Sequence, residues 1–266
     1  MIDMHLHAVP PGLPGAGPLS PLLERPADEV AATIREQMAQ AGLSAVLAMG
    51  RLDAGDDALG IESTLRIAEM VPHLHAIGAM DPRRADAGHL SRVEEQLPRV
   101  KALKGYLGYL HFGPDHPGYR PYYELAARHR VPVIFHTGDC WSPRAKLRFA
   151  HPLLVDEVAV DHPGVDFVMA HVGNPWMLDA AEVVYKNLNV WCDLSGLAVG
   201  DEPGDDETLA RLAAAWRYAE RPNRFVFGSD WPLAPVRAYR DWVIKAIPEE
   251  CREDVLDLNA RRLFRL

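Results

Sequence analysis

Five histidine and aspartate side chains could bind one metal ion if the fold brings them together. His5 and His7 are separated by a single residue in the segment MIDMHLH at the start of the chain. His136, His171 and Asp230 each end a short apolar segment further along the sequence. Imidazole and carboxylate groups suit Zn²⁺ first, with Mn²⁺, Fe²⁺ or Co²⁺ as alternatives. The residue types therefore predict a site for one divalent metal ion, provided that the elements carrying them converge.

Apolar segments typical of buried strands alternate along the chain with stretches of helical periodicity. The predicted strands are residues 1–7, 44–50, 74–80, 100–106, 131–137, 165–171, 188–194 and 224–230, and the predicted helices are 27–42, 55–71, 118–130, 150–162, 175–187, 205–220 and 235–247. This alternation indicates a parallel sheet covered by helices. Eight such units fill 266 residues, so we predict an α/β fold, a single-domain (β/α)8 TIM barrel over residues 1–266. The alternative, an open doubly wound sheet, often has a Gly-rich first turn that is absent here.

The barrel predicts where the candidate metal donors lie. Active sites of parallel barrels sit at the carboxyl ends of the strands, and the five donors end the first, fifth, sixth and eighth predicted strands. Residues two apart in a strand point to the same face, so His5 and His7 can reach one ion. A second pair with this spacing, His73 and His75, begins the third strand and is expected at the opposite end of the barrel.

Composition limits the expected partners and location. Lysine and arginine total 28 against 37 acidic residues, a net charge of -9, which argues against nucleic acid or an anionic membrane as the partner. The expected partner is a small-molecule substrate, and a homodimer is compatible with the sequence. No apolar run approaches the ~20 residues that span a bilayer, and the first residues lack a signal-peptide pattern. Three isolated cysteines favour a reduced, cytoplasmic protein.

Several motifs together resemble the amidohydrolase superfamily. They are DMHLH near the start, FHTG, AHVG followed by NPW, NVWCDLSG, FGSDWP and the closing NARRLF at 259–264. More narrowly they are similar to its "amidohydrolase 2" branch of metal-dependent TIM-barrel hydrolases and decarboxylases, which includes 2-amino-3-carboxymuconate 6-semialdehyde decarboxylase. The resemblance covers essentially the whole chain. It implies one metal ion held by His5, His7, His136 and Asp230, with His171 as a catalytic residue.

The chain departs from this branch in its length, because it is too short to hold large insertions that cap a substrate. Residues 10–26 contain six prolines and three glycines, a composition that excludes a helix or a central strand. We predict that this segment is a long, semi-rigid active-site loop that replaces the missing insertions.

Further residues near the predicted rim are candidates for substrate binding. Arg51 follows the second strand and suits a substrate carboxylate, or is a surface residue. Lys104 lies on the fourth strand, where binuclear amidohydrolases use a carboxylated lysine to bridge two metals; a substrate contact, an inner-barrel role and a structural role are its alternatives. Tyr106 and Trp176 line the pocket or pack. Asp3, on the same face as the first histidine pair, orients a ligand histidine or is a polar group of the strand start.

The predicted reaction is hydrolysis of a small amide, lactone or ester through a metal-bound hydroxide. A cation held in this way lowers the pKa of bound water from near 16 toward ~7 and polarises a carbonyl group. Asp230 can accept a proton from that water, and His171 can donate a proton or stabilise an oxyanion. The same ion could support non-oxidative decarboxylation of an unsaturated or aromatic acid, and the residues do not choose between the two reactions. A barrel that binds a ligand without turnover is the remaining alternative, which the intact donor set disfavours.

Overall fold

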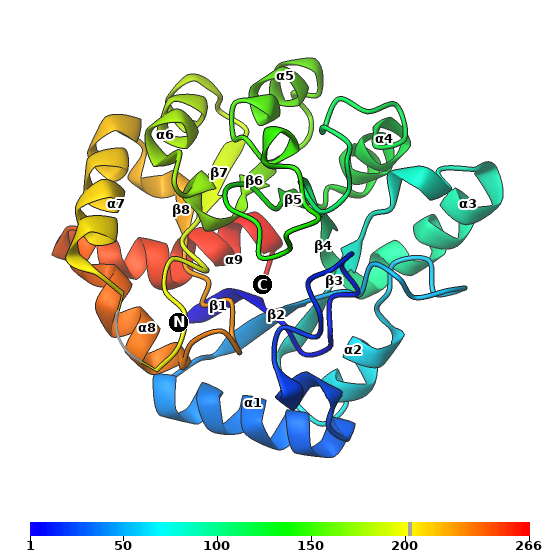
Figure 1. Ribbon diagram of the computed structural model, residues 1–266, viewed down its shortest axis with the longest axis horizontal. Helices are drawn as coiled ribbons and strands as arrows, with labels where there is room; N and C mark the ends of the chain where they lie inside the picture. Colours follow the sequence, from blue (N-terminus) through cyan, green and yellow to red (C-terminus); the bar gives the residue numbers. More distant parts are fainter. Residues whose placement is uncertain (202–203) are drawn as a thin grey trace.

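Eight parallel strands form one sheet in the computed structural model, which describes residues 1–201 and 204–266. The strands are adjacent in the order in which they occur in the sequence, and helices surround them (Figure 1). Their bounds are β1 Ile2–Leu6, β2 Ala45–Met49, β3 Leu74–Ala79, β4 Val100–Gly105, β5 Val133–Phe135, β6 Phe167–Met169, β7 Val190–Asp193 and β8 Phe225–Val226. Each lies within a predicted strand segment, and the predicted (β/α)8 barrel is confirmed.

Backbone hydrogen bonds join the first strand to the segment that follows the last. Asp230 donates its backbone N–H to the carbonyl oxygen of His5 at 2.7 Å, and His7 donates to the carbonyl oxygen of Trp231, also at 2.7 Å. These bonds continue the barrel between β8 and β1. They also hold two donor-bearing segments side by side although more than 200 residues separate them in sequence.

The helices that cover the barrel are α1 Ala27–Ala41, α2 Glu62–Ala68, α3 Ala87–Gln96, α4 Arg120–His129, α5 Leu154–Asp161, α6 Met177–Lys186, α7 Asp206–Ala219, α8 Val236–Val243 and α9 Asn259–Phe264. Helix α3 is absent from the predicted helices, although Asp86 caps it by accepting a hydrogen bond from the backbone of His89. Helix α2 is shorter than predicted because Gly55 and Gly60 adopt left-handed turn conformations before it. Over the described ranges, no helix combines the length and the apolar character needed to cross a membrane.

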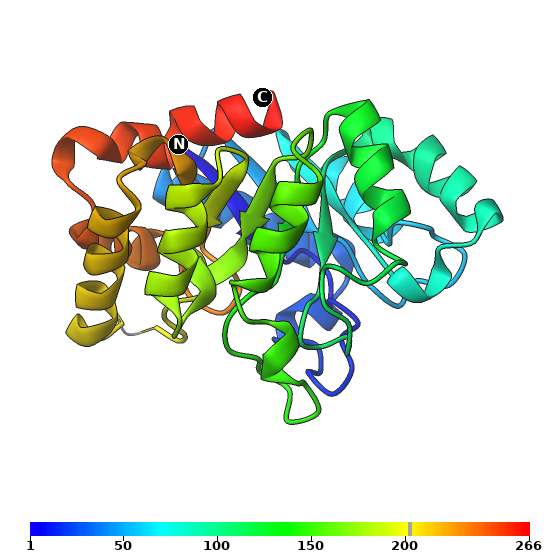
Figure 2. The ribbon, with the colours of Figure 1, turned by 90° about the horizontal axis from the view of Figure 1, so that it is seen from above.

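Two apolar layers pack against the strands. In β2, Leu47 and Met49 contact the inner layer whereas Val46 and Ala48 contact the layer between sheet and helices. Helix α9 packs its side chains against the inner layer at the amino-terminal end of the strands. Figure 2 shows α9 at one end of the barrel and the loops around residues 10–20 and 138–149 projecting from the other end. The two ends therefore differ: one is plugged by a helix, and the other carries the long loops.

The Pro-rich segment crosses the loop-bearing end. It is irregular as far as a short 3-10 helix at Pro21–Glu24. Leu13 and Ala16 pack in one apolar cluster with Tyr109, and Ser142 donates its hydroxyl to the carbonyl oxygen of Pro14 at 2.8 Å. The segment therefore contacts the loop that follows β5. Its role in covering a substrate stays a prediction.

Candidate metal centre

An irregularity in β1 turns the first two histidines into the barrel. Met4 belongs to the inner apolar layer, so regular alternation would point His5 outward. The pairing of β1 with β2 shifts between Asp3 and Leu6, and Leu6 contacts the outer layer. Beyond this shift the odd-numbered residues face inward, and His5 and His7 point into the site. The extra residue re-aims side chains at the strand end, as strand irregularities beside active sites often do.

The donor atoms of His5 and His7 lie at the separations from Asp230 that are expected around one ion, and His171 lies close to them. The Nε2 atoms of His5 and His7 are 3.5 and 3.3 Å from Oδ1 of Asp230. Ligands about 2.0–2.1 Å from a tetrahedral Zn²⁺ are about 3.3 Å from one another. His5, His171 and Asp230 each offer one donor atom within 4.8 Å of the others, and all three side chains are buried. Oδ1 of Asp230 has no hydrogen-bond partner among the described residues, so the arrangement fits a metal ion.

The hydrogen bonds of His136 and His171 leave one unprotonated ring nitrogen in each residue, and these two nitrogens face each other. Nε2 of His136 lies 2.9 Å from the carbonyl oxygen of Asp139, and Nδ1 of His171 lies 3.1 Å from that of Ser195. Because a carbonyl oxygen only accepts, we assign the ring proton to each of these nitrogens. In neutral rings the other nitrogens, Nδ1 of His136 and Nε2 of His171, are then both acceptors, and they are 3.2 Å apart. In these tautomers two lone pairs lie close together, an arrangement that a cation beside them would stabilise.

Asp193 orients the ring of His5. Its Oδ2 accepts a hydrogen bond from Nδ1 of His5 at 2.5 Å, while its Oδ1 accepts from the backbone of Ser195 at 2.6 Å. A carboxylate behind a ligand histidine fixes the ring and its tautomer, which leaves Nε2 free for a metal. Asp193 is not among the residues singled out from the sequence. Its place at the end of β7, on the same rim as the other donors, is the signal that could have identified it.

Asp3 anchors the backbone of β1 and does not contact the histidine rings. Its Oδ1 accepts hydrogen bonds from the backbone of His5 at 3.1 Å and of Ser229 at 3.0 Å, and its Oδ2 accepts from the Ser229 hydroxyl at 2.6 Å. Burial raises the pKa of Asp3 to about 7 in spite of these bonds. Of its two predicted roles, the structure thus supports that of a strand-start polar group, which ties β1 to the segment leading to Asp230.

The electrostatics of the cluster favour a divalent cation. Burial lowers the pKa of His5, His136 and His171, so that their rings are neutral at neutral pH. Burial alone would raise the pKa of Asp230, but its interactions with His5, His7 and His171 outweigh this and keep the pKa well below its usual range. Neutral imidazoles beside an ionised carboxylate are the protonation states in which these groups bind metals.

The backbone at two of the donors is held in a left-handed conformation. His171 has φ 62° and Asp230 has φ 61°, values that non-glycine residues adopt at a cost of roughly 1–2 kcal/mol. Gly196 lies against both, because a Cβ added there would be 2.6 Å from Nδ1 of His171 and 2.9 Å from Oδ2 of Asp230. Strained residues of this kind cluster at functional sites, where the surrounding structure over-determines them.

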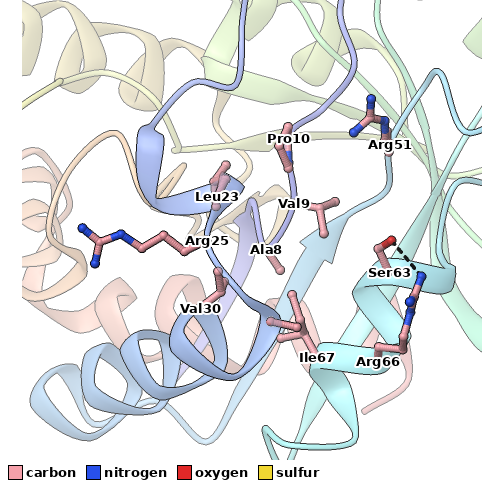
Figure 3. A pocket seen from close by; sticks show the side chains of 11 residues that line it. Ala8, Val9, Pro10, Leu23, Arg25, Val30, Arg51, Ser63, Arg66 and Ile67 are labelled. Carbon is pink, nitrogen blue, oxygen red and sulfur yellow. Dashed lines mark hydrogen bonds between the residues drawn. The ribbon is translucent and has the colours of Figure 1, made fainter.

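Arg51 lies at the edge of a separate cavity. It is exposed, donates from Nε to the carbonyl oxygen of Asp53 at 3.0 Å, and lines a cavity of about 240 Å³ between the segment after β1, α1 and α2. Figure 3 shows Arg51 at one side of this cavity, which has an apolar floor that includes Val30 and Ile67. The lining residues include none of the five donors, so binding of substrate by Arg51 stays a prediction.

The other predicted substrate residues differ in their positions. Tyr106 is buried and donates its hydroxyl to the carbonyl oxygen of Gly50 at 2.9 Å. Trp176 precedes α6, where its ring lies 4.8 Å from the ring of His151. Lys104 is buried inside the barrel near the end of β4. The pair at 73 and 75 lies at the start of β3, the end of the strand opposite to the rim.

A (β/α)8 barrel that gathers imidazole and carboxylate donors at the carboxyl ends of its strands has the architecture of a metal-dependent barrel enzyme. Residues 2–266 match the family model Amidohydro_2, described as amidohydrolase, and the chain belongs to this family. The match confirms the resemblance seen in the sequence motifs and identifies an enzymatic family of hydrolases and decarboxylases. Comparison with curated protein sequences gave no match.

Solved structures with the same fold carry different activities in their names. A probable 2-pyrone-4,6-dicarboxylic acid hydrolase from Acinetobacter baumannii has a TM-score of 0.69 at 14% identity and covers 100% of this chain and 99% of its own. An amidohydrolase from Burkholderia multivorans with bound zinc gives 0.69 at 18%, with 100% and 99% covered. The 2,6-dihydroxybenzoate decarboxylase from Rhizobium gives 0.69 at 17%, with 99% and 98% covered. At these identities the likeness shows the fold alone.

Proposed function

We propose that this protein is a metal-dependent hydrolase of a small amide, lactone or ester. The observation that carries the proposal is the buried group of His5, His171 and Asp230, whose donor atoms lie within 4.8 Å of one another at the carboxyl ends of the strands. Family membership supports metal-dependent enzyme chemistry at this place, and the zinc-bearing barrel from Burkholderia multivorans favours zinc as the single divalent ion.

Four side chains would hold the ion: His5, His7 and Asp230, with His136 as the fourth ligand. Their fit to a cation is supported by the distances of 3.5 and 3.3 Å from Oδ1 of Asp230 to the Nε2 atoms of His5 and His7. When bound, a divalent ion supplies Lewis acidity, which lowers the pKa of water and polarises a substrate carbonyl. A catalytic metal needs only three or four protein ligands, so His171 is available for work on the substrate.

Two groups of the chain would move protons. Asp230 places Oδ1 toward His5 and His7 and leaves Oδ2 on the side of His171, 3.9 Å from Nδ1 of that ring. Oδ2 can accept the proton of an attacking water. His171 is neutral because burial lowers its pKa, and its Nε2 can accept a proton and return it to the leaving group.

The test is turnover in ¹⁸O-labelled water with the purified protein loaded separately with zinc, manganese, iron and cobalt. The panel contains lactones, amides, esters, and unsaturated and aromatic carboxylic acids, and mass spectrometry follows the products. A hydrolase places one ¹⁸O atom in the acid product, and protein stripped by a chelator serves as the control. We expect labelled acid from at least one lactone, amide or ester.

Two outcomes would overturn this proposal. Release of CO2 from a carboxylic acid, with no label gained by the other product, would identify a decarboxylase, the activity named for the Rhizobium structure. Tight binding of one metal equivalent without turnover of any substrate on the panel would identify a non-catalytic ligand-binding barrel.

A further inference from the structure

Lys104 places a cationic group inside the barrel. It is the fifth residue of β4, and its side chain is 1% exposed. Strand alternation puts Lys104 on the same face as Ala102 of the inner layer, whereas Leu103 between them faces the outer layer. Among the described residues, Nζ of Lys104 has no hydrogen-bond partner. The contact that the structure does show is with the ring face of Tyr106, whose centroid is 5.7 Å from Nζ.

An unpaired ammonium group in this environment is costly. Buried charges are normally paired, because their loss of hydration costs several kcal/mol unless other groups replace the water. Burial lowers the pKa of Lys104 to about 8, so the amine still carries its proton in most molecules at neutral pH. A ring face offsets only part of the lost hydration. Among the described residues, nothing accepts a hydrogen bond from the three donors of this ammonium.

Strand pairing places Lys104 next to Ile134 of β5, two residues before His136. The field of Lys104 lowers the pKa of His5, His136 and His171. In return, Asp193 and Asp230 raise the pKa of Lys104. The ammonium thus acts on both histidine and aspartate members of the centre from β4, a strand that supplies no metal donor. An acceptor that enters the site could interact with both the bound cation and Lys104.

We propose that Lys104, as an unmodified ammonium group, donates a hydrogen bond to a negatively charged oxygen of the substrate. This inference rests on the proposed function and deepens it. In the hydrolysis of a lactone, amide or ester, the oxygen is that of the scissile carbonyl, which gains negative charge as water adds to the carbon. The ammonium stabilises that charge without giving up its proton. The alternative is a carboxylated Lys104 that bridges two metals, which would require two equivalents of ion.

The test measures binding, so that it does not depend on an identified substrate. The zinc-loaded protein is titrated calorimetrically with acetohydroxamate, which presents anionic oxygen to a metal, and with imidazole, a neutral metal ligand. The variants are Lys104→Met, which removes the charge, and Lys104→Arg, which retains it. Lys101→Met is the matched control, because Lys101 lies on the same strand but reaches out to the carbonyl oxygen of Arg265 at the exposed end.

We expect Lys104→Met to bind acetohydroxamate roughly 10- to 100-fold more weakly, the worth of one charge-assisted hydrogen bond. Imidazole affinity and zinc content should remain at the wild-type level, Lys104→Arg should recover part of the loss, and Lys101→Met should behave as wild type. Equal weakening of both probes would show that Lys104 only supports the metal centre, and unchanged acetohydroxamate binding would show that it makes no such contact.

Two further readouts separate the alternatives. A carbamate signal in the ¹³C spectrum after equilibration with ¹³C-bicarbonate, or loss of a second metal equivalent in Lys104→Met, would replace the proposal with a bridging lysine. Failure of the proposed function has a different signature. In that case no substrate would be turned over by the wild type, yet the two probes would still respond differently to the loss of the Lys104 charge.

Discussion

Two histidines of the centre have nearly equivalent surroundings but different proposed roles. His136 and His171 follow neighbouring strands, both donate one ring proton to a backbone carbonyl, and their free nitrogens are 3.2 Å apart. The geometric group of donors contains His171, whereas the family resemblance assigns His136 to the metal and His171 to proton transfer. Because three histidines and one carboxylate satisfy a single ion, one of the five donors is redundant for affinity.

Replacing each histidine separately distinguishes the ligand from the proton-transfer group. We expect His136→Ala to lose metal and activity together. His171→Ala and His171→Asn should retain most of the metal but lower kcat by ~10²–10⁴, the usual worth of a positioned acid or base. Elemental analysis of the purified variants beside kcat provides the measurement. If His171→Ala loses its metal as completely as His136→Ala, then His171 is a ligand, and a two-metal site that includes Lys104 becomes the better description.

At the scale of strands, helices and loops, periodicity was sufficient to predict the barrel and the rim on which the donors gather. The eight strands fall within their predicted segments because continuous apolar runs bounded by Gly and Pro leave few alternatives. The local irregularity of β1 could not be predicted, since it depends on how β1 pairs with β2 and on the bonds that Asp3 makes with Ser229. Helix α3 was missed because its apolar stripe is short, with Val93 and His89 as its buried residues.

The role of Asp193 was also beyond sequence reasoning, because only the folded barrel shows which strand-end carboxylate faces a histidine. Asp193 ends β7 and Asp230 follows β8. Asp230 faces the Nε2 atoms of His5 and His7, whereas Asp193 faces Nδ1 of His5. Spacing along the chain does not contain this difference. Residue type and rim were predictable, whereas the assignment of each residue to a contact required the three-dimensional register of neighbouring strands.

The loop after β7 contacts the centre through Gly196, so a side chain added there should disturb the centre. Gly196→Ala adds a methyl group at φ 65° that would overlap the ring of His171 and the carboxylate of Asp230. We expect the loop to move and the metal affinity and kcat to fall, with kcat lower by ~10²-fold, the effect of displacing reacting groups by about 1 Å. Zinc affinity measured by competition with a chelator, together with the melting temperature, checks this expectation.

The matched control for this substitution is Gly200→Ala. Gly200 has φ 96° and is close to Gly196 in sequence, but a Cβ there meets no heavy atom of residues 1–201 and 204–266 within 4 Å. Its replacement should cost roughly 1 kcal/mol of stability through backbone strain alone and leave zinc affinity unchanged. Equal loss of zinc affinity in the two variants would show that backbone strain in the loop, and not the contact with His171 and Asp230, controls the centre.

For the molecule as a whole, the catalytic proposal implies a lower free energy of unfolding for the protein without substrate. The barrel is sealed at one end by α9 and an apolar inner layer, yet at the other end it buries carboxylates, imidazoles and an ammonium group. A buried ammonium group whose acceptor is a substrate oxygen lowers the stability of the protein when no substrate is bound. This trade between stability and function is common at active sites, and here a single residue, Lys104, allows it to be measured.

The pH dependence of unfolding isolates this contribution. The pKa of Lys104 falls from 10.5 to about 8 in the folded protein because of burial. Because the pKa of Lys104 is lower in the folded than in the unfolded protein, the unfolded chain binds the proton first as the pH falls. The folded protein therefore has its full free energy of unfolding above pH 10.5 and loses this contribution as the pH falls through 8. The shift corresponds to about 3 kcal/mol at pH 7. In urea titrations of chelator-treated protein, we therefore expect Lys104→Met to be more stable than wild type at pH 7, and the difference to shrink steadily as the pH is raised to 9.5. Lys101→Met should show no such trend. A difference that is independent of pH, or a less stable Lys104→Met at pH 7, would mean that the charge of the Lys104 amine is already paired in the folded barrel, so that its pKa stays near the ordinary value.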